Sequence, residues 1–225
     1  MTTPEGHRSA PGGIDAVRCR IGARRGEVKA FLIHGEDALV LVDTGASAED
    51  GDRIAAAIRR RMSDTVAFAA IVLTHGHLDH IGGLARIRAE FGWPVAAHPA
   101  EADRMAAAGH RADVDIADGD HWPHGGGLRF VHLPGHTPGS IAVWHAATGT
   151  LVAGDAILSA ARHLVVSPPF LSDDPAEARN SVARLLESGL DIRSVLVAHG
   201  DDVPDHADEP LSRMLLSVRY ELFAP

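Results

Sequence analysis

The sequence predicts an α+β fold in which two β-sheets are covered on their outer faces by helices. Apolar runs with the length of strands alternate with stretches whose apolar residues recur at helical spacing. The strand-like runs also fall into two groups, one before residue 100 and one after residue 127. A chain of 225 residues is most simply a single domain over residues 1–225, because sheet-containing domains commonly reach this length undivided.

The first group of strands begins with a hairpin. Two apolar runs, 28–34 and 38–45, are separated by a short polar turn, which is a hairpin pattern. An amphipathic helix is expected over 48–62, because Ile54, Ile58 and Met62 recur at helical spacing. The other elements expected before residue 109 are strands over 68–73 and 95–98, a helix from His80 to Phe91 and a helix over 99–108.

The second group of strands is expected over 128–133, 140–146 and 150–155, and the segment 194–200 is expected to be a strand that passes into a loop. Asp174 and Pro175 predict the start of a helix that ends near Gly189, because Asp is a favoured N-cap and Pro a favoured first-turn residue. A last helix is expected over 209–222. The remaining segments are expected to lack regular structure: a disordered tail over 1–13, and irregular segments over 109–127 and 156–174.

Composition and charge exclude several classes of partner. The net charge of -9 argues against nucleic acid, because nucleic-acid binders present a basic face. The sequence has neither an apolar run long enough to cross a membrane nor one before Ile14 that would indicate a signal peptide. We therefore expect a cytoplasmic protein that acts on a small molecule. The single cysteine, Cys19, is expected to be a small buried residue, and the oligomeric state stays open, with a homodimer among the options.

A block of six residues, His75-Gly76-His77-Leu78-Asp79-His80, concentrates three imidazoles and a carboxylate. These are the usual ligands of catalytic zinc sites. His75 and His77 are two residues apart, so in extended backbone they project to the same side and could share one ion. Asp79 and His80 begin the expected helix and could serve a second ion beside the first.

Three further candidate ligands each follow a strand-like run. They are His136 in LPGHTPGS, Asp155 in VAGD and His199 in VAHGD. Considered alone, each histidine would more simply be a surface residue and the aspartate a turn residue. Because they occur together with the block of His75 to His80, we expect them to be metal ligands. The complete candidate set is His75, His77, Asp79, His80, His136, Asp155 and His199. Seven ligands suffice for two ions that share one carboxylate.

Together with Asp43 in LVDTG, these pieces resemble the metallo-β-lactamase superfamily, which includes glyoxalase II, lactonases, β-lactamases and RNase Z. They occur in the order of that family and span most of the chain. The resemblance implies a four-layer αβ/βα sandwich, with two mixed sheets, helices on the outer faces and the site at one edge. It also implies that His75, His77 and His136 hold a first ion and that Asp79, His80 and His199 hold a second. Asp155 would bridge the two ions. Asp43 would accept a hydrogen bond from a ligand histidine.

The resemblance further implies two divalent metal ions, with zinc favoured over iron or manganese. Zinc brings the pKa of bound water to about 7, so a bridging hydroxide could attack a carbonyl. Asp155 and Asp79 are the catalytic candidates, the first as bridge and the second as proton donor to the leaving group. We rank hydrolysis of a small thioester or acyl ester, as in glyoxalase II, first. Lactone or β-lactam hydrolysis, sulfur oxidation at a single iron and a non-enzymatic metal-binding module are the alternatives.

Several departures bear on this ranking. The residues after Asp155 lack the tyrosine common in lactonases, and β-lactamases usually lack an aspartate at this place. Only 26 residues follow His199, fewer than the helical glutathione-binding domain of longer glyoxalase II members requires, although shorter relatives exist. Secondary expectations are hydrogen bonds to the ligands from Thr74, Thr137 and Ser140, a place for His163 in the cleft, and cover for an apolar substrate from Trp122 and Phe170.

Overall fold

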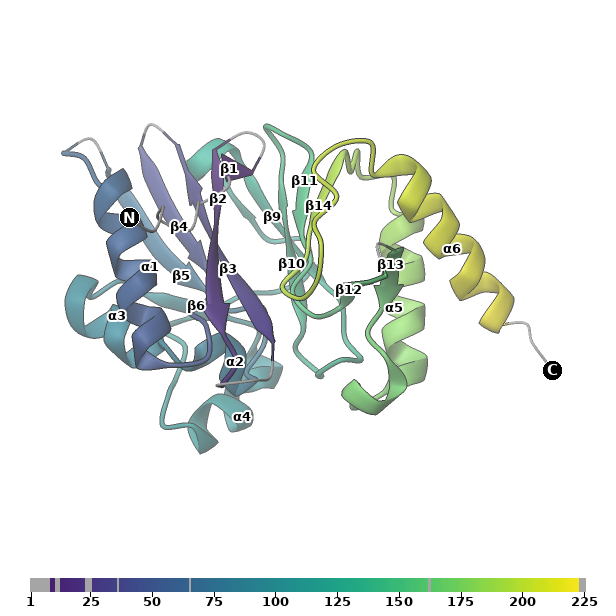
Figure 1. The fold of residues 1–225 in the computed structure, drawn as a ribbon, viewed down its shortest axis with the longest axis horizontal. Coiled ribbons are helices and arrows are strands. Elements are labelled where there is room, and N and C mark those ends of the chain that lie inside the picture. Colours follow the sequence, from purple (N-terminus) through teal and green to yellow (C-terminus); the bar gives the residue numbers. More distant parts are fainter. Residues whose placement is uncertain are drawn as a thin grey trace, which may run out of the picture.

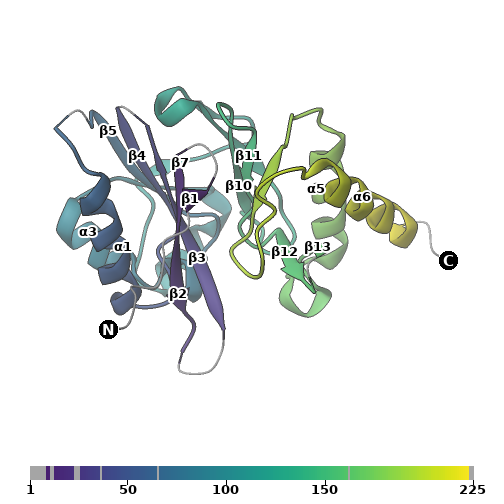
Figure 2. The same cartoon turned by 45° about the horizontal axis from the view of Figure 1, so that its top comes forward.

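Two β-sheets face each other across the centre of the protein, and helices cover the outer face of each (Figures 1 and 2). The computed structural model describes residues 9–10, 13–22, 26–35, 37–64, 66–161 and 163–222. The four layers are therefore helix, sheet, sheet and helix, as the sequence predicts. No helix in these described ranges has the length and apolar character needed to cross a membrane.

Within the described part of the chain, the first sheet contains seven strands in sequential order. They are β1 (Ser9–Ala10), β2 (Ile14–Arg20), β3 (Glu27–His34), β4 (Ala38–Val42), β5 (Phe68–Val72), β6 (Val95–Ala97) and β7 (Val114–Asp115). Strands β1 to β4 pair antiparallel and β4 to β7 pair parallel. The predicted hairpin is β3–β4, with Ile33 opposite Val40.

Two expectations for the N-terminal region need correction. Strand β2 was not predicted, because its second half alternates buried Val17 and Cys19 with charged Arg18 and Arg20 and so lacks a continuous apolar run. The disordered tail predicted over 1–13 lies outside the described residues at 1–8 and 11–12, whereas Ser9–Ala10 forms β1 and pairs with β2.

The second sheet contains five strands in the order β14-β11-β10-β9-β8. They are β8 (His121–Trp122), β9 (Leu128–His132), β10 (Ile141–His145), β11 (Thr150–Val152) and β14 (Ser194–Leu196). Strand β14 runs parallel to β11, and the other pairs are antiparallel. The short strands β7 and β8 lie within the segment 109–127, which we expected to be irregular.

The segment 156–174 also departs from the expectation of irregular structure. It contains a separate hairpin of β12 (Ile157–Ala160) and β13 (His163–Val166). Ala161, directly after β12, has a φ of +48°. Gly and Asn are the residues that normally mark such a left-handed turn, so the sequence offers no signal for this hairpin.

Helices α1 (Ala48–Arg61) and α3 (Leu84–Phe91) cover the first sheet, and α5 (Pro175–Glu187) and α6 (Asp208–Leu222) cover the second (Figure 1). Asp174 caps α5 as predicted, accepting hydrogen bonds from the backbone N–H groups of Ala176 and Glu177. The single helix expected from His80 to Phe91 is two helices, α2 (Leu78–Ile81) and α3. The expected helix over 99–108 is a 3₁₀ turn, Pro99–Glu101, followed by α4 (Ala102–Ala107).

The packing between the sheets fixes where the candidate ligands lie. Phe31 of β3 and Phe130 of β9 are fully buried in the apolar layer that joins the two sheets. In the second sheet Val152 of β11 pairs with Leu196 of the parallel β14. Asp155 and His199 each follow one member of that pair by three residues, so the strand register brings them to the same edge.

Gly135 sets how closely α5 approaches the loop that carries His136. Its φ is +132°, and a Cβ there would lie 2.1 Å from the backbone nitrogen of Ala178 in α5. We predict that Gly135→Ala lowers the free energy of unfolding by roughly 2–4 kcal/mol, from backbone strain and overpacking together. Urea unfolding measures this change.

Gly189→Ala is the matched control. Gly189 also has a positive φ, +77°, but among the described residues other than its chain neighbours no atom lies within 4 Å of the Cβ position. Its replacement should cost only about 1 kcal/mol, from the left-handed backbone alone. Equal losses of stability in the two variants would contradict the close contact at Gly135.

Candidate metal centre

All seven side chains that the sequence singles out as ligands converge at one edge of the two sheets. Three overlapping groups have ligand atoms that all lie within 4.8 Å of one another. The groups are His75, His77 and His136; His75, His80 and Asp155; and Asp79, His80 and His199. Segments far apart in the sequence thus form a single cluster able to hold metal ions.

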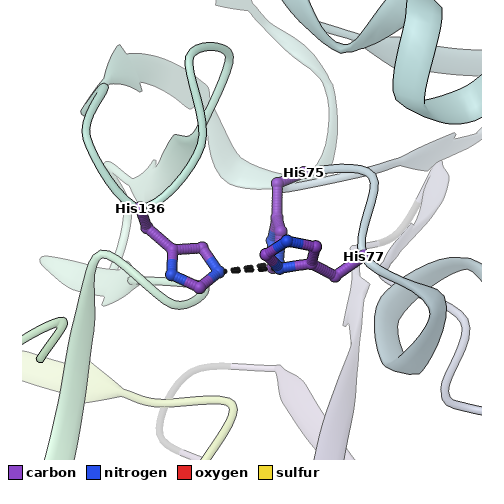
Figure 3. Close-up of side chains that lie close together, drawn as sticks. All are labelled: His75, His77 and His136. Carbon is purple, nitrogen blue, oxygen red and sulfur yellow. Dashed lines mark hydrogen bonds between the residues drawn. The ribbon is translucent and has the colours of Figure 1, made fainter. Parts of the chain in front are cut away.

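Three histidines form the first part of the cluster (Figure 3). His75 and His77 come from the loop between β5 and α2, and His136 from the loop between β9 and β10. His77 Nδ1 lies 3.0 Å from His75 Nε2 and 2.9 Å from His136 Nε2, and the two Nε2 atoms are 3.1 Å apart. Nitrogens on a tetrahedral zinc ion would be about 3.3–3.4 Å apart, so a small expansion of this triangle accommodates zinc.

Asp155 connects the two parts of the cluster. Its Oδ2 lies 3.6 Å from His136 Nε2 and 3.5 Å from His199 Nε2. Its Oδ1 lies 3.3 Å from His80 Nε2. Asp79 completes the second part, with its Oδ2 3.4 Å from His199 Nε2. The carboxylate of Asp155 therefore lies between the two parts of the cluster, within 3.6 Å of candidate ligands from both.

Asp43 fixes the orientation of two candidate ligands. Its Oδ2 accepts hydrogen bonds from His80 Nδ1 and from Thr74 Oγ1, both at 2.8 Å. Because the Thr74 hydroxyl donates its proton to Asp43, it accepts from His75 Nδ1, 3.1 Å away. Both imidazoles thus carry their proton on Nδ1 and present the Nε2 lone pair to the cluster, which is how carboxylates set metal-binding tautomers. The sequence predicts this role for Asp43 and a ligand contact for Thr74.

Two other contacts orient ligands but were not predicted. Ser167 Oγ lies 2.9 Å from His136 Nδ1, and the backbone carbonyl of Glu27 accepts from His199 Nδ1 at 3.0 Å. Thr137 and Ser140 do not take the predicted role, because their hydroxyls hydrogen-bond to each other at 2.8 Å. Ser167 lies 31 residues from His136 in the sequence, so local spacing could not reveal the contact.

The histidines of the cluster fall into two classes by the direction in which their pKa values are shifted. Burial lowers the pKa of His75 well below its ordinary value and that of His136 to about 4, so both stay neutral and keep a lone pair. Burial also opposes charge on His80 and His199, but neighbouring carboxylates outweigh it. Asp155 and Asp43 raise the pKa of His80 well above its ordinary value. Hydrogen bonds with Asp155 and Asp79 raise the pKa of His199 to about 9.

Two buried atoms indicate that the residues fit a cation. Among the described residues, His80 Nε2 and Asp155 Oδ1 have no hydrogen-bond partner, although they lie 3.3 Å apart. With the proton on Nδ1 that Asp43 accepts, neutral His80 would turn a nitrogen lone pair towards a carboxylate oxygen, and this juxtaposition is part of what raises the pKa of His80. Unpaired buried polar atoms are costly, and a metal ion that accepts both lone pairs would relieve that cost.

His77 is the ligand whose surroundings would have to adjust. Arg104 Nη1 lies 3.2 Å from His77 Nε2, and a guanidinium can only donate. Coordination through His77 Nδ1 places the ring proton on Nε2, where it would meet the arginine N–H. The Arg104 side chain is about one third exposed, so the guanidinium can turn away.

The remaining sequence expectations have mixed outcomes. Cys19 is buried as predicted, and burial raises the pKa of its thiol to about 12. Trp122 packs between the sheets against Phe130, with ring centroids 4.9 Å apart, rather than over the cluster. Phe170 is 84% exposed and available to a ligand. His163 lines a separate cavity of about 420 Å³ between β13 and α6.

The hydrogen bonds of Asp43 lead to a prediction about metal affinity. Asp43 has a φ of +63°, a conformation that Asn also tolerates. Asp43→Asn should therefore retain the backbone but replace one acceptor oxygen by a donor, leaving Thr74 and His80 imperfectly bonded. We expect zinc affinity to fall by about 10–100-fold, the usual effect of changing an outer carboxylate. Competition with a chromogenic chelator measures it; an unchanged dissociation constant would contradict the assignment.

Comparison with known proteins agrees with this geometry. The sequence profile of the metallo-beta-lactamase superfamily matches residues 23–199. The Bacillus subtilis protein named "Probable metallo-hydrolase YflN" is 27% identical over 200 residues, which cover 72% of this chain and 75% of that protein. The hydroxyacylglutathione hydrolase of Aeromonas hydrophila is 35% identical over 130 residues, which cover 58% of this chain and 46% of that enzyme. The chain thus spans about half the length of this enzyme.

Solved structures share the fold. A metallo-beta-lactamase from Pontibacter korlensis has a TM-score of 0.77 at 19% identity, covering 95% of this chain and 98% of that one. The metallo-beta-lactamase FIM-1 from Pseudomonas aeruginosa has a TM-score of 0.76 at 18% identity, covering 99% and 98%. The predicted four-layer sandwich is confirmed by these similarities. Since the family profile covers more than half of its length, the chain belongs to the metallo-beta-lactamase superfamily.

Proposed function

We propose that this metal-dependent hydrolase holds two divalent metal ions, zinc in preference to iron or manganese, and cleaves a small thioester or acyl ester. The position of Asp155 carries the proposal. Its Oδ2 lies 3.6 Å from His136 of the three-histidine group and 3.5 Å from His199 of the Asp79, His80 and His199 group, and its Oδ1 lies 3.3 Å from His80 of that second group. One carboxylate between two groups of nitrogen ligands is the arrangement that a pair of ions requires.

When bound, such ions supply a hydroxide nucleophile at neutral pH and polarise the scissile carbonyl. The protein's own contribution is to orient the ligands and to handle protons. Asp43, Thr74 and the Glu27 carbonyl accept the Nδ1 protons of His80, His75 and His199 on the side away from the cluster. Ser167 hydrogen-bonds to Nδ1 of His136. Asp79, whose side chain is 28% exposed, can receive a proton on a carboxylate oxygen and pass it to a leaving group.

The choice of a thioester draws on the relatives. Several similar proteins are hydroxyacylglutathione hydrolases, 32–36% identical over 130–155 residues. The match covers about half of those enzymes, so the proposal extends to the acyl thioester bond and not to glutathione as the thiol. Hydrolysis of a lactone or a β-lactam, sulfur oxidation at one iron and a structural metal module are the competing outcomes of the tests below.

Metal content is the first test of the proposal. Wild-type protein loaded with zinc and freed of excess metal should contain two zinc ions per chain by elemental analysis. His136→Ala should lose the ion held by the three-histidine group and retain about one, because two of three ligands bind an ion poorly. Unchanged zinc in the variant would refute the ligand assignment, and one iron per chain in the protein as purified would favour the oxygenase.

Substrate preference is the second test. We expect a thioester to be cleaved faster than a lactone or a β-lactam in a matched panel. Asp155→Ala should lower kcat/KM for the best substrate at least about 100-fold, equivalent to about 2.7 kcal/mol of transition-state stabilisation. Asp201→Ala removes an exposed aspartate two residues after His199 and should leave activity unchanged. Full activity of Asp155→Ala would exclude the bridging role, and absence of any hydrolysis by wild type would favour the metal-binding module.

A further inference from the structure

Glu101 is a buried carboxylate that belongs to none of the three candidate ligand groups. It ends the 3₁₀ turn before α4, and the residue is only 1% exposed. Its Oε2 accepts a hydrogen bond from the backbone N–H of Gly76 at 2.8 Å. Its Oε1 accepts one from the backbone N–H of Gly139 at 2.7 Å. Both oxygens are therefore committed to backbone groups.

The two backbone groups belong to the loops that carry the three-histidine group. Gly76 lies between His75 and His77, and Gly139 lies three residues after His136. The first loop follows β5 of one sheet and the second precedes β10 of the other. Besides the backbone hydrogen bond from the Ile141 N–H to the Thr74 carbonyl at 2.9 Å, this one carboxylate links two loops that follow and precede strands of different sheets.

At both positions, the absence of a Cβ lets the Glu101 carboxylate approach the backbone closely. A Cβ on Gly76 would lie 3.0 Å from Glu101 Oε2, and a Cβ on Gly139 would lie 2.8 Å from Glu101 Oε1. Neither glycine has a left-handed backbone. Close approach of the carboxylate to the two N–H groups, and not backbone conformation, is therefore what requires glycine at these positions.

Arg104 extends the contact to the other side of the cluster. Its Nε lies 3.6 Å from Glu101 Oε2, and its Nη2 lies 2.5 Å from Asp173 Oδ2. The backbone N–H of Asp173 in turn donates to the carbonyl of His136 at 3.1 Å. The guanidinium therefore balances the charge of the buried carboxylate and links it to the segment that supports His136.

We propose that Glu101 is a positioning residue that assembles the three-histidine group before a metal ion arrives. The inference rests on the proposed metal centre. In the metal-free protein the three imidazole nitrogens lie about 3 Å apart, where His77 Nδ1 can donate to one of the other two. When a metal ion takes the place of that proton, the loops that carry the three rings must keep them in position. Without Glu101, the two loops would lose conformational entropy when the ion binds. The loss of Glu101 therefore weakens the metal affinity in addition to any loss of folding stability.

Glu101→Gln tests this role with little change of shape. The Gln amide keeps one acceptor oxygen and places its NH₂ donor against the N–H of one glycine, so that one of the two hydrogen bonds is lost. We expect zinc affinity of the three-histidine group to fall about 10–100-fold, measured by chelator competition on the full chain. The d–d absorption spectrum of the Co²⁺-loaded protein should change at the same group. Gly139→Ala, which pushes against Glu101 from the other side, should give the same selective loss.

Asp50→Asn is the matched control. Asp50 is also 1% exposed and accepts from two backbone N–H groups, of Arg20 and Ala46, but it touches none of the candidate ligands. This variant should lower stability to urea in the metal-free protein and leave zinc affinity unchanged.

The outcomes separate the two proposals. Wild type with two zinc ions and Glu101→Gln with unchanged affinity would overturn the positioning role while the metal centre stands. Equal weakening by Glu101→Gln and Asp50→Asn would also overturn it, because the effect would then be one of general stability. A wild-type protein that binds no zinc would overturn the metal centre itself.

Discussion

The contact between His80 and Asp155 constrains everything else at this edge of the fold. Both side chains are buried, and the hydrogen bond from His80 Nδ1 to Asp43 leaves the other ring nitrogen, Nε2, facing a carboxylate oxygen at 3.3 Å. Positive charge must lie between or beside them, because an uncompensated buried carboxylate is strongly unfavourable. The chain can offer protonated histidine, and a pair of divalent ions would satisfy the same requirement while also supporting hydrolysis.

Both sheets contribute candidate ligands to the same edge of the fold. The parallel pairing of β11 with β14 sets Asp155 and His199 side by side, and the loop after β5 brings in the histidine block from the other sheet. Each ring is then turned by a group from elsewhere in the chain, as Ser167 turns His136 and the carbonyl of Glu27 turns His199. These contacts hold the imidazole rings in fixed orientations towards the cluster.

Sequence patterns predicted the elements and candidate ligands that are set by residues close together in the sequence. They did not predict the hydrogen bonds between residues far apart in the sequence. The β3–β4 hairpin, α1 and the cap of α5 follow from periodicity and capping residues. The seven candidate ligands stand out by residue type and by their places after strand-like runs. Ser167 and Glu101 carry no such signal, since their partners lie 25 to 38 residues away. Thr137 and Ser140, adjacent to a ligand in sequence, bond to each other instead.

Anomalous diffraction at the zinc absorption edge, from crystals of the zinc-loaded protein, tests the central claim most directly. The account predicts two peaks on either side of the Asp155 carboxylate. One should lie among His75, His77 and His136, and the other among Asp79, His80 and His199. A well-ordered structure of zinc-loaded protein with no peak beside Asp155, or with the Asp155 and His199 side chains turned away from the histidine block, would contradict it.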